Sequence, residues 1–126
     1  MKLLLSLFLS LLISSANAGF SEGLDAMRNG DYKTAIFNFN QALEKEEQDV
    51  FKPMIRRYMA ISYYYANDDI DNDYKLSFKN FMLASERFDE DVLHYLGNMY
   101  YFGRGVDQDY TKAKESFEKA NKYQEN

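Results

Sequence analysis

Apolar and small residues recur at helical spacing through this chain of 126 residues. In one segment, Ala113, Phe117 and Ala120 follow one another at intervals of four and three residues, so they share one face of a helix. Lysines and glutamates occupy the other face, where opposite charges four residues apart stabilise a helix. Together with turn and capping residues, this spacing predicts helices over residues 20–29, 32–46, 51–66, 74–87, 90–102 and 110–123.

The predicted helices repeat one order of side chains three times. Tyr110, Ala113, Phe117 and Ala120 correspond to Tyr74, Ser77, Phe81 and Ala84, and earlier in the chain to Tyr32, Ala35, Phe39 and Ala42. The preceding helices carry Gly23, Ala60 and Gly97, small residues that let a neighbouring helix approach closely. A helix pair cannot bury all of its apolar surface alone, so repeated pairs stack on one another. The repetition predicts three units, over about 19–48, 49–88 and 89–126.

The turn inside the third unit is predicted from its glycines. Gly103 and Gly105 supply permissive backbone, Val106 is available to pack beneath the turn, and Asp109 caps the helix that follows. The second unit has no glycine at this place and keeps only Ile70 in the position of Val106. We therefore expect a different loop in the second unit.

Residues 67–73 are predicted to form that loop, with Asp73 capping the next helix. The alternating carboxylates that begin at Asp69 are also similar to the start of an EF-hand calcium loop. The similarity ends at Tyr74 and Asn80, where such a loop needs glycine and glutamate. A solvated loop is favoured, and the sequence predicts neither a metal site nor a cofactor.

The third unit resembles a Sel1-like repeat, a relative of the tetratricopeptide repeat with the approximate pattern LGxxYxxGxGVxxDxxKAxxxFxKA. The residues that match it are Leu96, Gly97, Tyr100, Gly103, Gly105, Val106, Asp109, Lys112, Ala113, Phe117, Lys119 and Ala120. The resemblance covers nearly all of the chain after residue 18 and is weakest in the second unit. It implies an all-α fold, a short right-handed α-solenoid of about three antiparallel helix pairs, which serves as a binding scaffold.

The N-terminus has the features of a secretory leader. Lys2 precedes an apolar run over residues 3–13, and Ala16 and Ala18 form a cleavage site. A membrane anchor is the alternative, but the run is shorter than the roughly 20 residues that span a bilayer. The sequence predicts that residues 1–18 are removed, leaving 19–126 as a single domain in the periplasm or outside the cell. Without cysteine, neither lipid attachment nor disulfides are available.

The net charge of −5 disfavours binding to nucleic acid or to anionic membrane surfaces. We therefore expect a protein partner, and no stable membrane insertion after the leader is removed. An acidic chain favours a partner with a basic patch.

Eleven tyrosines and ten phenylalanines exceed what three small interhelical cores require, so some rings should be exposed. In tetratricopeptide-like folds, the first helix of each pair lines the concave face. The residues expected to project from it are Phe20, Leu24, Met27, Arg28, Met54, Arg57, Ile61, Tyr64, Tyr65, Asp91, His94, Asn98, Tyr101 and Phe102. Such a groove suits a peptide, a loop or a helix of a partner. The alternative is that many of these rings only cover the adjacent unit.

The sequence gives little support for catalysis. His94 is the single histidine and no thiol is present, so a nucleophilic triad or a zinc site is disfavoured. Gly103 and Gly105 lack the third glycine and the preceding strand of a dinucleotide-binding loop. We expect a protein that is not an enzyme.

The family resemblance implies a non-catalytic, exported protein-binding module. One hypothesis is an immunity or inhibitor protein that neutralises an envelope-targeting toxin or hydrolase by occluding its catalytic cleft. The alternatives are an adaptor or regulator of envelope machinery, a peptidoglycan-binding or small-ligand-binding module, and a chain that closes its groove by self-association.

Overall fold

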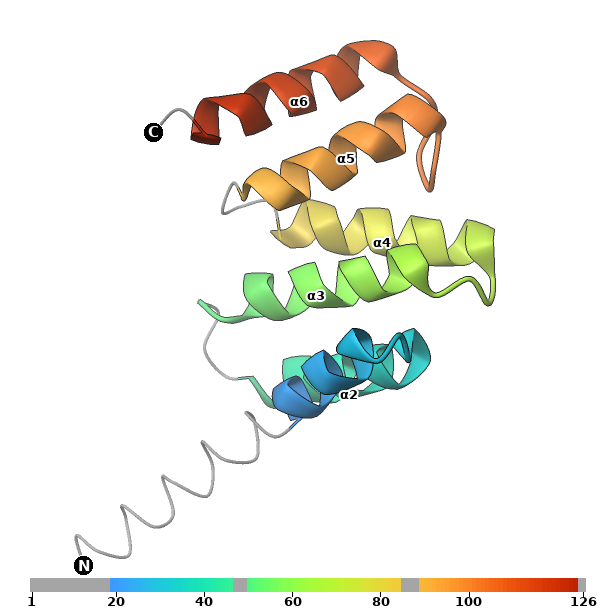
Figure 1. Cartoon of the computed structure of the whole chain (residues 1–126), viewed down its shortest axis with the longest axis vertical. Coiled ribbons are helices and arrows are strands. Elements are labelled where there is room, and N and C mark those ends of the chain that lie inside the picture. The colour runs from blue at the N-terminus through green and yellow to red at the C-terminus, as the bar shows by residue number, and fades with distance from the viewer. Residues whose placement is uncertain (1–18, 47–49, 85–88, 125–126) are drawn as a thin grey trace, which may run out of the picture.

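The computed structural model of the chain describes residues 19–46, 50–84 and 89–124, and the regular structure in these residues is helical. A first helical segment covers residues 19–28. It is followed by α2 (Tyr32–Lys45), α3 (Lys52–Tyr65), α4 (Ile70–Ala84), α5 (Glu90–Phe102) and α6 (Tyr110–Gln124). The helices lie side by side in chain order, which puts α2 and α6 at opposite ends of a stack (Figure 1). The predicted all-α class is confirmed for this part of the chain.

Some predictions fall on residues that the structure does not describe. The predicted leader, residues 1–18, lies outside the described residues, as do the predicted end of the fourth helix at residue 87 and the unit borders near residues 48 and 88. Across the described ranges, no helix combines the length and the apolar character needed to cross a membrane.

The start of α4 corrects the prediction of a loop over residues 67–73. The helix begins at Ile70, because the Asp73 carboxylate accepts a hydrogen bond from the Asp69 N–H at 3.1 Å. The Asp73 N–H in turn donates to the Asp69 carbonyl at 2.7 Å, which closes a helical turn. Ile70 is exposed on this turn. It differs in this from Val106, its counterpart in the third unit, which packs against the second buried cluster.

Aspartates cap three of the helices. The carboxylates of Asp31 and Asp109 accept hydrogen bonds from backbone N–H groups three residues further on, at 3.1 and 3.0 Å, and Asp89 accepts one from Asp91 at 3.0 Å. These bonds satisfy donors that the first turn of a helix leaves free. The predicted cap at Asp109 is confirmed. Hydrogen bonds from Thr34 lower the pKa of the Asp31 carboxyl below its ordinary value.

Glycines allow close contact within the first and third helix pairs. A Cβ added to Gly23 would lie 2.6 Å from Cε1 of Phe39, and one added to Gly97 would lie 2.5 Å from Cε1 of Phe117. Both distances are below van der Waals contact, so each phenylalanine packs where a side chain would otherwise stand. The prediction that Gly23 and Gly97 let a neighbouring helix approach closely is confirmed in these two units.

Two buried clusters join successive units. One consists of Ala35, Phe39, Ala42, Ile55 and Met59, and the other of Ala60, Phe81, Val92, Leu96 and Met99. Between α3 and α4, the Ser77 hydroxyl donates to the Ala60 carbonyl at 2.8 Å, which satisfies a buried polar group. Through these two clusters, α3 and α5 each pack on the unit that precedes them.

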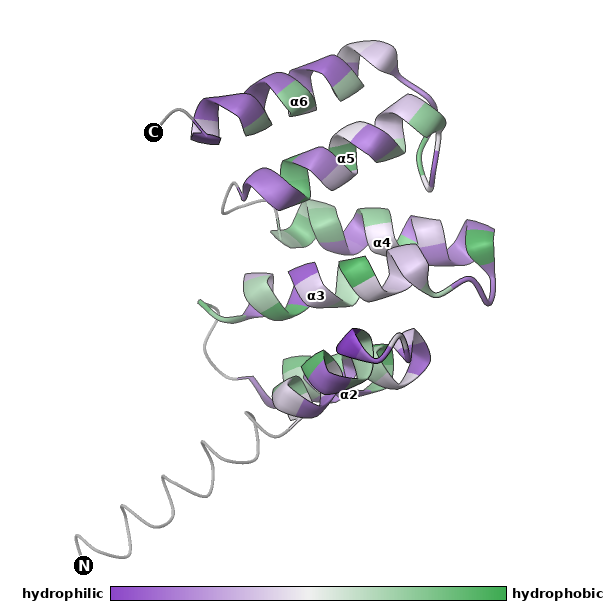
Figure 2. Cartoon of the chain, in the orientation of Figure 1, coloured by the Kyte–Doolittle hydropathy of each residue, from purple (hydrophilic) through white to green (hydrophobic). Residues whose placement is uncertain are grey.

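Hydrophilic residues predominate on α6, the last of the described helices (Figure 2).

Candidate binding surface

Aromatic side chains contact one another from unit to unit and form a strip. Most of them come from the ends of helices next to the turns within the helix pairs, and Figure 1 shows these turns on the right. Tyr32 at the start of α2 stacks on Tyr65 at the end of α3, with ring centroids 5.8 Å apart. Tyr65 also contacts Tyr64, with centroids 5.1 Å apart, and its hydroxyl lies 3.2 Å from that of Tyr95 on α5. We define the aromatic strip as these four tyrosines together with Tyr74, Tyr101, Phe102, Arg104 and Tyr110.

Arg104 links the parts of the strip that come from different units. Its guanidinium lies over the rings of Tyr64, Tyr74 and Phe102, at 5.7, 5.4 and 4.7 Å from their centroids. It also donates a hydrogen bond to the Tyr64 hydroxyl at 2.6 Å. A cation over an aromatic face is attracted by the ring quadrupole. Among the described residues, no carboxylate forms an ion pair with Arg104.

The position of Arg104 follows from the glycines on either side of it. Gly103 has a φ of 65° and ends α5, and Gly105 has a φ of 72°. A Cβ at Gly105 would lie only 2.2 Å from the carbonyl oxygen of Tyr74. The turn therefore rests directly on the backbone of α4, which brings Arg104 against the Tyr74 ring.

Tyr95 is a half-buried member of the strip that contacts α4 as well as α3. Its ring stacks on Phe81, with centroids 4.9 Å apart and an interplanar angle of 17°. Burial raises the pKa of Tyr95 above its ordinary value, and the hydrogen bond with Tyr65 raises it further. The phenol therefore stays protonated well into the alkaline range and holds α5 against α3.

Four rings of the strip remain exposed. Tyr65, Tyr101, Phe102 and Tyr110 keep 42%, 47%, 56% and 61% of their surface accessible. Tyr101 contacts both Phe102 and Tyr110, with centroids 4.9 and 5.2 Å apart. Large exposed rings that contact one another are typical of surfaces that bind another molecule.

Exposed carboxylates lie in the two turns that are next to strip residues in the sequence. Asp68 and Asp69 lie in the turn before α4, and Asp107 lies in the turn before α6. Acidic groups next to apolar rings favour a partner segment that carries apolar side chains with basic residues beside them.

The residues predicted for the concave face are divided between core and surface. Phe20, Leu24 and Met27 pack against the first buried cluster, and Ile61 and Tyr64 pack against the second. Those that are exposed are Arg28, Met54, Tyr65, Asp91, Tyr101 and Phe102, while Arg57, His94 and Asn98 are half-buried. The structure brings Tyr64, Tyr65, Tyr101 and Phe102 together in the strip.

Arg57 and Asp91 are brought together in a contact between units. The Arg57 guanidinium pairs with Asp89 and, at 2.9 Å, with Asp91, which ties α3 to the start of α5. His94 lies 3.7 Å from Glu90 on its own helix. Arg57 and its two aspartates thus connect α5 to the preceding unit, whereas the contact between His94 and Glu90 lies within α5.

Five members of the strip were not among the predicted site residues: Tyr32, Tyr74, Tyr95, Arg104 and Tyr110. A signal for three of them exists, because Tyr32, Tyr74 and Tyr110 hold the same place in the repeated order. Arg104 has no such signal, since its place depends on the contact between Gly105 and α4.

Neither a scan against protein-family models nor a search of curated proteins finds a match to this chain. Within the described ranges, no three His, Cys, Asp or Glu side chains are grouped so that they could hold a metal ion. The aromatic strip is therefore the feature of the described residues that points to a function.

Proposed function

We propose that this protein is a non-catalytic binding module, built of three Sel1-like helix pairs in a short right-handed α-solenoid, that binds a segment of another protein through the aromatic strip. The observation that carries the proposal is the contact of Tyr101 with Phe102 and Tyr110, all three of them exposed. When a partner covers large exposed rings, their apolar surface is removed from water, which favours formation of the complex. The repeat assignment is supported by the glycine and phenylalanine contacts in the first and third pairs.

The proposal places the protein in the periplasm or outside the cell, since residues 1–18 have the composition of a leader. In that compartment, we propose that it acts as an inhibitor, of the kind that confers immunity to a toxin. The strip binds a loop or helix of a toxin or hydrolase and obstructs its catalytic cleft. An adaptor of envelope machinery would use the same strip but leave its partner active.

The proposal is tested by capture of the partner. Protein recovered after expression of the full chain is immobilised, and proteins retained from the envelope and secreted fractions of the source organism are identified by mass spectrometry. We expect one protein in stoichiometric amount. Loss of its activity on binding supports the inhibitor, whereas unchanged activity supports the adaptor.

Two matched variants locate the interface. Phe102→Ala removes an exposed ring of the strip and should weaken binding by roughly tenfold or more, as the loss of an aromatic anchor does. Phe37→Ala removes a ring of similar exposure, 62%, from α2, and should leave binding unchanged. Tyr64 is a poor choice for this test because it packs against the second buried cluster, so its loss would also disturb the fold.

Equal retention by the Phe102→Ala and Phe37→Ala variants would place the interface away from the strip. If no protein is retained and glycan fragments raise the Tm instead, the ligand-binding alternative takes precedence.

A further inference from the structure

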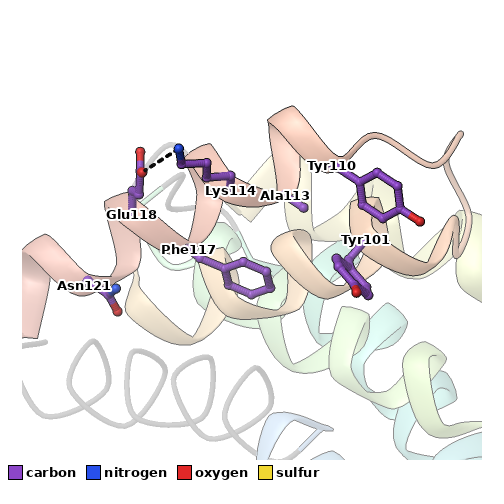
Figure 3. A pocket seen from close by; sticks show the side chains of 7 residues that line it. All are labelled: Tyr101, Tyr110, Ala113, Lys114, Phe117, Glu118 and Asn121. Atoms are coloured by element: carbon purple, nitrogen blue, oxygen red, sulfur yellow. Dashed lines mark ion pairs between the residues drawn. The ribbon is translucent and has the colours of Figure 1, made fainter.

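An open groove lies at the C-terminal end of the stack, between the end of α5 and α6 (Figure 3). It has a volume of about 540 Å³, and Tyr101, Tyr110, Ala113 and Phe117 supply apolar surface to it. Lys114 and Glu118 line it as well and pair with each other at 3.8 Å. We call this site the terminal groove.

In the two earlier units, a tyrosine of the next helix covers the phenylalanine that corresponds to Phe117. Tyr58 of α3 stacks on Phe39, with centroids 6.2 Å apart and an interplanar angle of 26°. Tyr95 of α5 stacks on Phe81 in the same manner. Among the described residues, no tyrosine stacks on Phe117. The third unit thus has the receiving surface of the first two without the helix that fills it.

The two helices that fill the earlier positions share one pattern. Each has an aliphatic residue, then a tyrosine three residues later, then an apolar residue directly after it. The residues are Ile55, Tyr58 and Met59 in α3, and Val92, Tyr95 and Leu96 in α5. The apolar members are all buried, and the spacing puts the three side chains on one helical face.

The chain does not offer a free helix of this kind to a second copy of itself. In head-to-tail stacking, the first helical segment would enter the terminal groove. It carries Ser21 where the other two helices have tyrosine, and Glu22 where they have methionine or leucine. Burying that carboxylate is costly, because the lysine that lines the groove, Lys114, already pairs with Glu118. The equivalent faces of α3 and α5 are already buried within the chain.

We propose that the terminal groove binds an amphipathic helix of a partner protein that carries the aliphatic, Tyr, apolar pattern, with its tyrosine stacked on Phe117. The inference rests on the proposed function in that the occupant belongs to another protein, and it adds the kind of element that binds and where. Recognition of a helix in an apolar groove by residues three and four apart is a common mode of binding.

A peptide with the sequence of residues 51–66 provides the pattern and serves as the probe. It is labelled with fluorescein and titrated with protein expressed as the full chain, and binding is followed by fluorescence anisotropy. We expect saturable binding that weakens by at least about tenfold when the peptide carries Tyr58→Ala. Tyr110→Ser in the protein should weaken it too, whereas Phe37→Ser, which alters a ring of equal exposure on α2, should not.

A chimera supplies the same helix within the chain. A copy of residues 85–102 is placed directly after Ala120, in place of residues 121–126, so that it follows α6 as α5 follows α4. We expect the Tm to rise by roughly 5 °C or more and the peptide to lose its binding site. The matched control carries Tyr95→Ala within the appended copy and should lose most of the gain.

Absence of saturable peptide binding, or binding that the chimera leaves unchanged, would overturn the proposal. A wild-type dimer in sedimentation equilibrium that Tyr110→Ser dissociates would also overturn it, because a second copy would then be the occupant. Neither measurement uses the captured partner. Failure of the terminal groove to bind a helix is therefore distinguishable from failure of the aromatic strip to bind a protein.

Discussion

Substituting Gly105 by alanine should destabilise the protein far more than the same substitution at Gly30. Both glycines have a positive φ, 72° and 77°, which an alanine adopts only with strain. A Cβ at Gly105 would lie 2.2 Å from the Tyr74 carbonyl oxygen, whereas one at Gly30 would meet no atom within 4 Å. The two variants therefore separate the cost of close packing from the cost of backbone strain.

The expected magnitudes follow from these two contributions. The left-handed conformation costs about 1 kcal/mol for alanine at either position. At Gly105 the Cβ also meets the helix backbone of α4, and rotation of a side chain cannot relieve the contact. Overpacking of this kind costs about 1–3 kcal/mol. We expect Gly105→Ala to lower the free energy of unfolding by about 2–4 kcal/mol, and Gly30→Ala by about 1 kcal/mol.

Urea unfolding followed by far-UV circular dichroism measures both values. For a domain of this size, each kcal/mol also lowers the Tm by roughly 4–8 °C, which gives an independent check. Equal free energies of unfolding for the two variants would refute the close contact between the turn and α4. That result would also contradict the placement of Arg104 against Tyr74, which depends on this contact.

Two further variants test contacts between helices. Because the pKa of Tyr95 is raised in the folded state, the unfolded chain loses this proton first, and stability should fall as the pH rises above about 10. Tyr95→Phe should reduce that fall in urea titrations between about pH 8 and 11, and an unchanged slope would contradict the assignment. Ser77→Ala removes the hydroxyl that donates to the Ala60 carbonyl between α3 and α4, and should cost about 1 kcal/mol in urea unfolding. Ser116→Ala is its control on α6, and an equal loss would argue against the bond.

The helix pairs could be predicted because small residues and rings recur at fixed spacing. Gly97 and Phe117 form the contact that this spacing implies, and so do Gly23 and Phe39. The start of α4 could not be predicted in the same way. There the hydrogen bonds between Asp69 and Asp73 extend the helix through a run of aspartates that has the composition of a loop.

The candidate site was predictable only where it coincides with helical spacing. The spacing from the packing residues of each helix predicts that Tyr65, Tyr101 and Phe102 project from the fold, and all three are exposed. The same helical spacing also predicts exposure for Phe20 and Leu24, which pack against the first cluster. Spacing within one helix does not show how far the next helix covers its face. Side chains held by turns, such as Arg104, depend on contacts between units.

The excess of aromatic residues has a physical explanation in the repeat itself. A tyrosine stands first in the repeated order of each unit. In the first unit it is Tyr32, which Tyr65 covers, and in the second it is Tyr74, which Tyr64 and Arg104 cover. At Tyr110 the same position is 61% exposed, because no described unit follows. Each unit thus presents rings that suit the next helix, and the last unit presents them to solvent. Tyr101 and Tyr110 belong to both the aromatic strip and the terminal groove. A partner helix in the terminal groove would therefore continue onto the strip, so one partner element suffices for both surfaces.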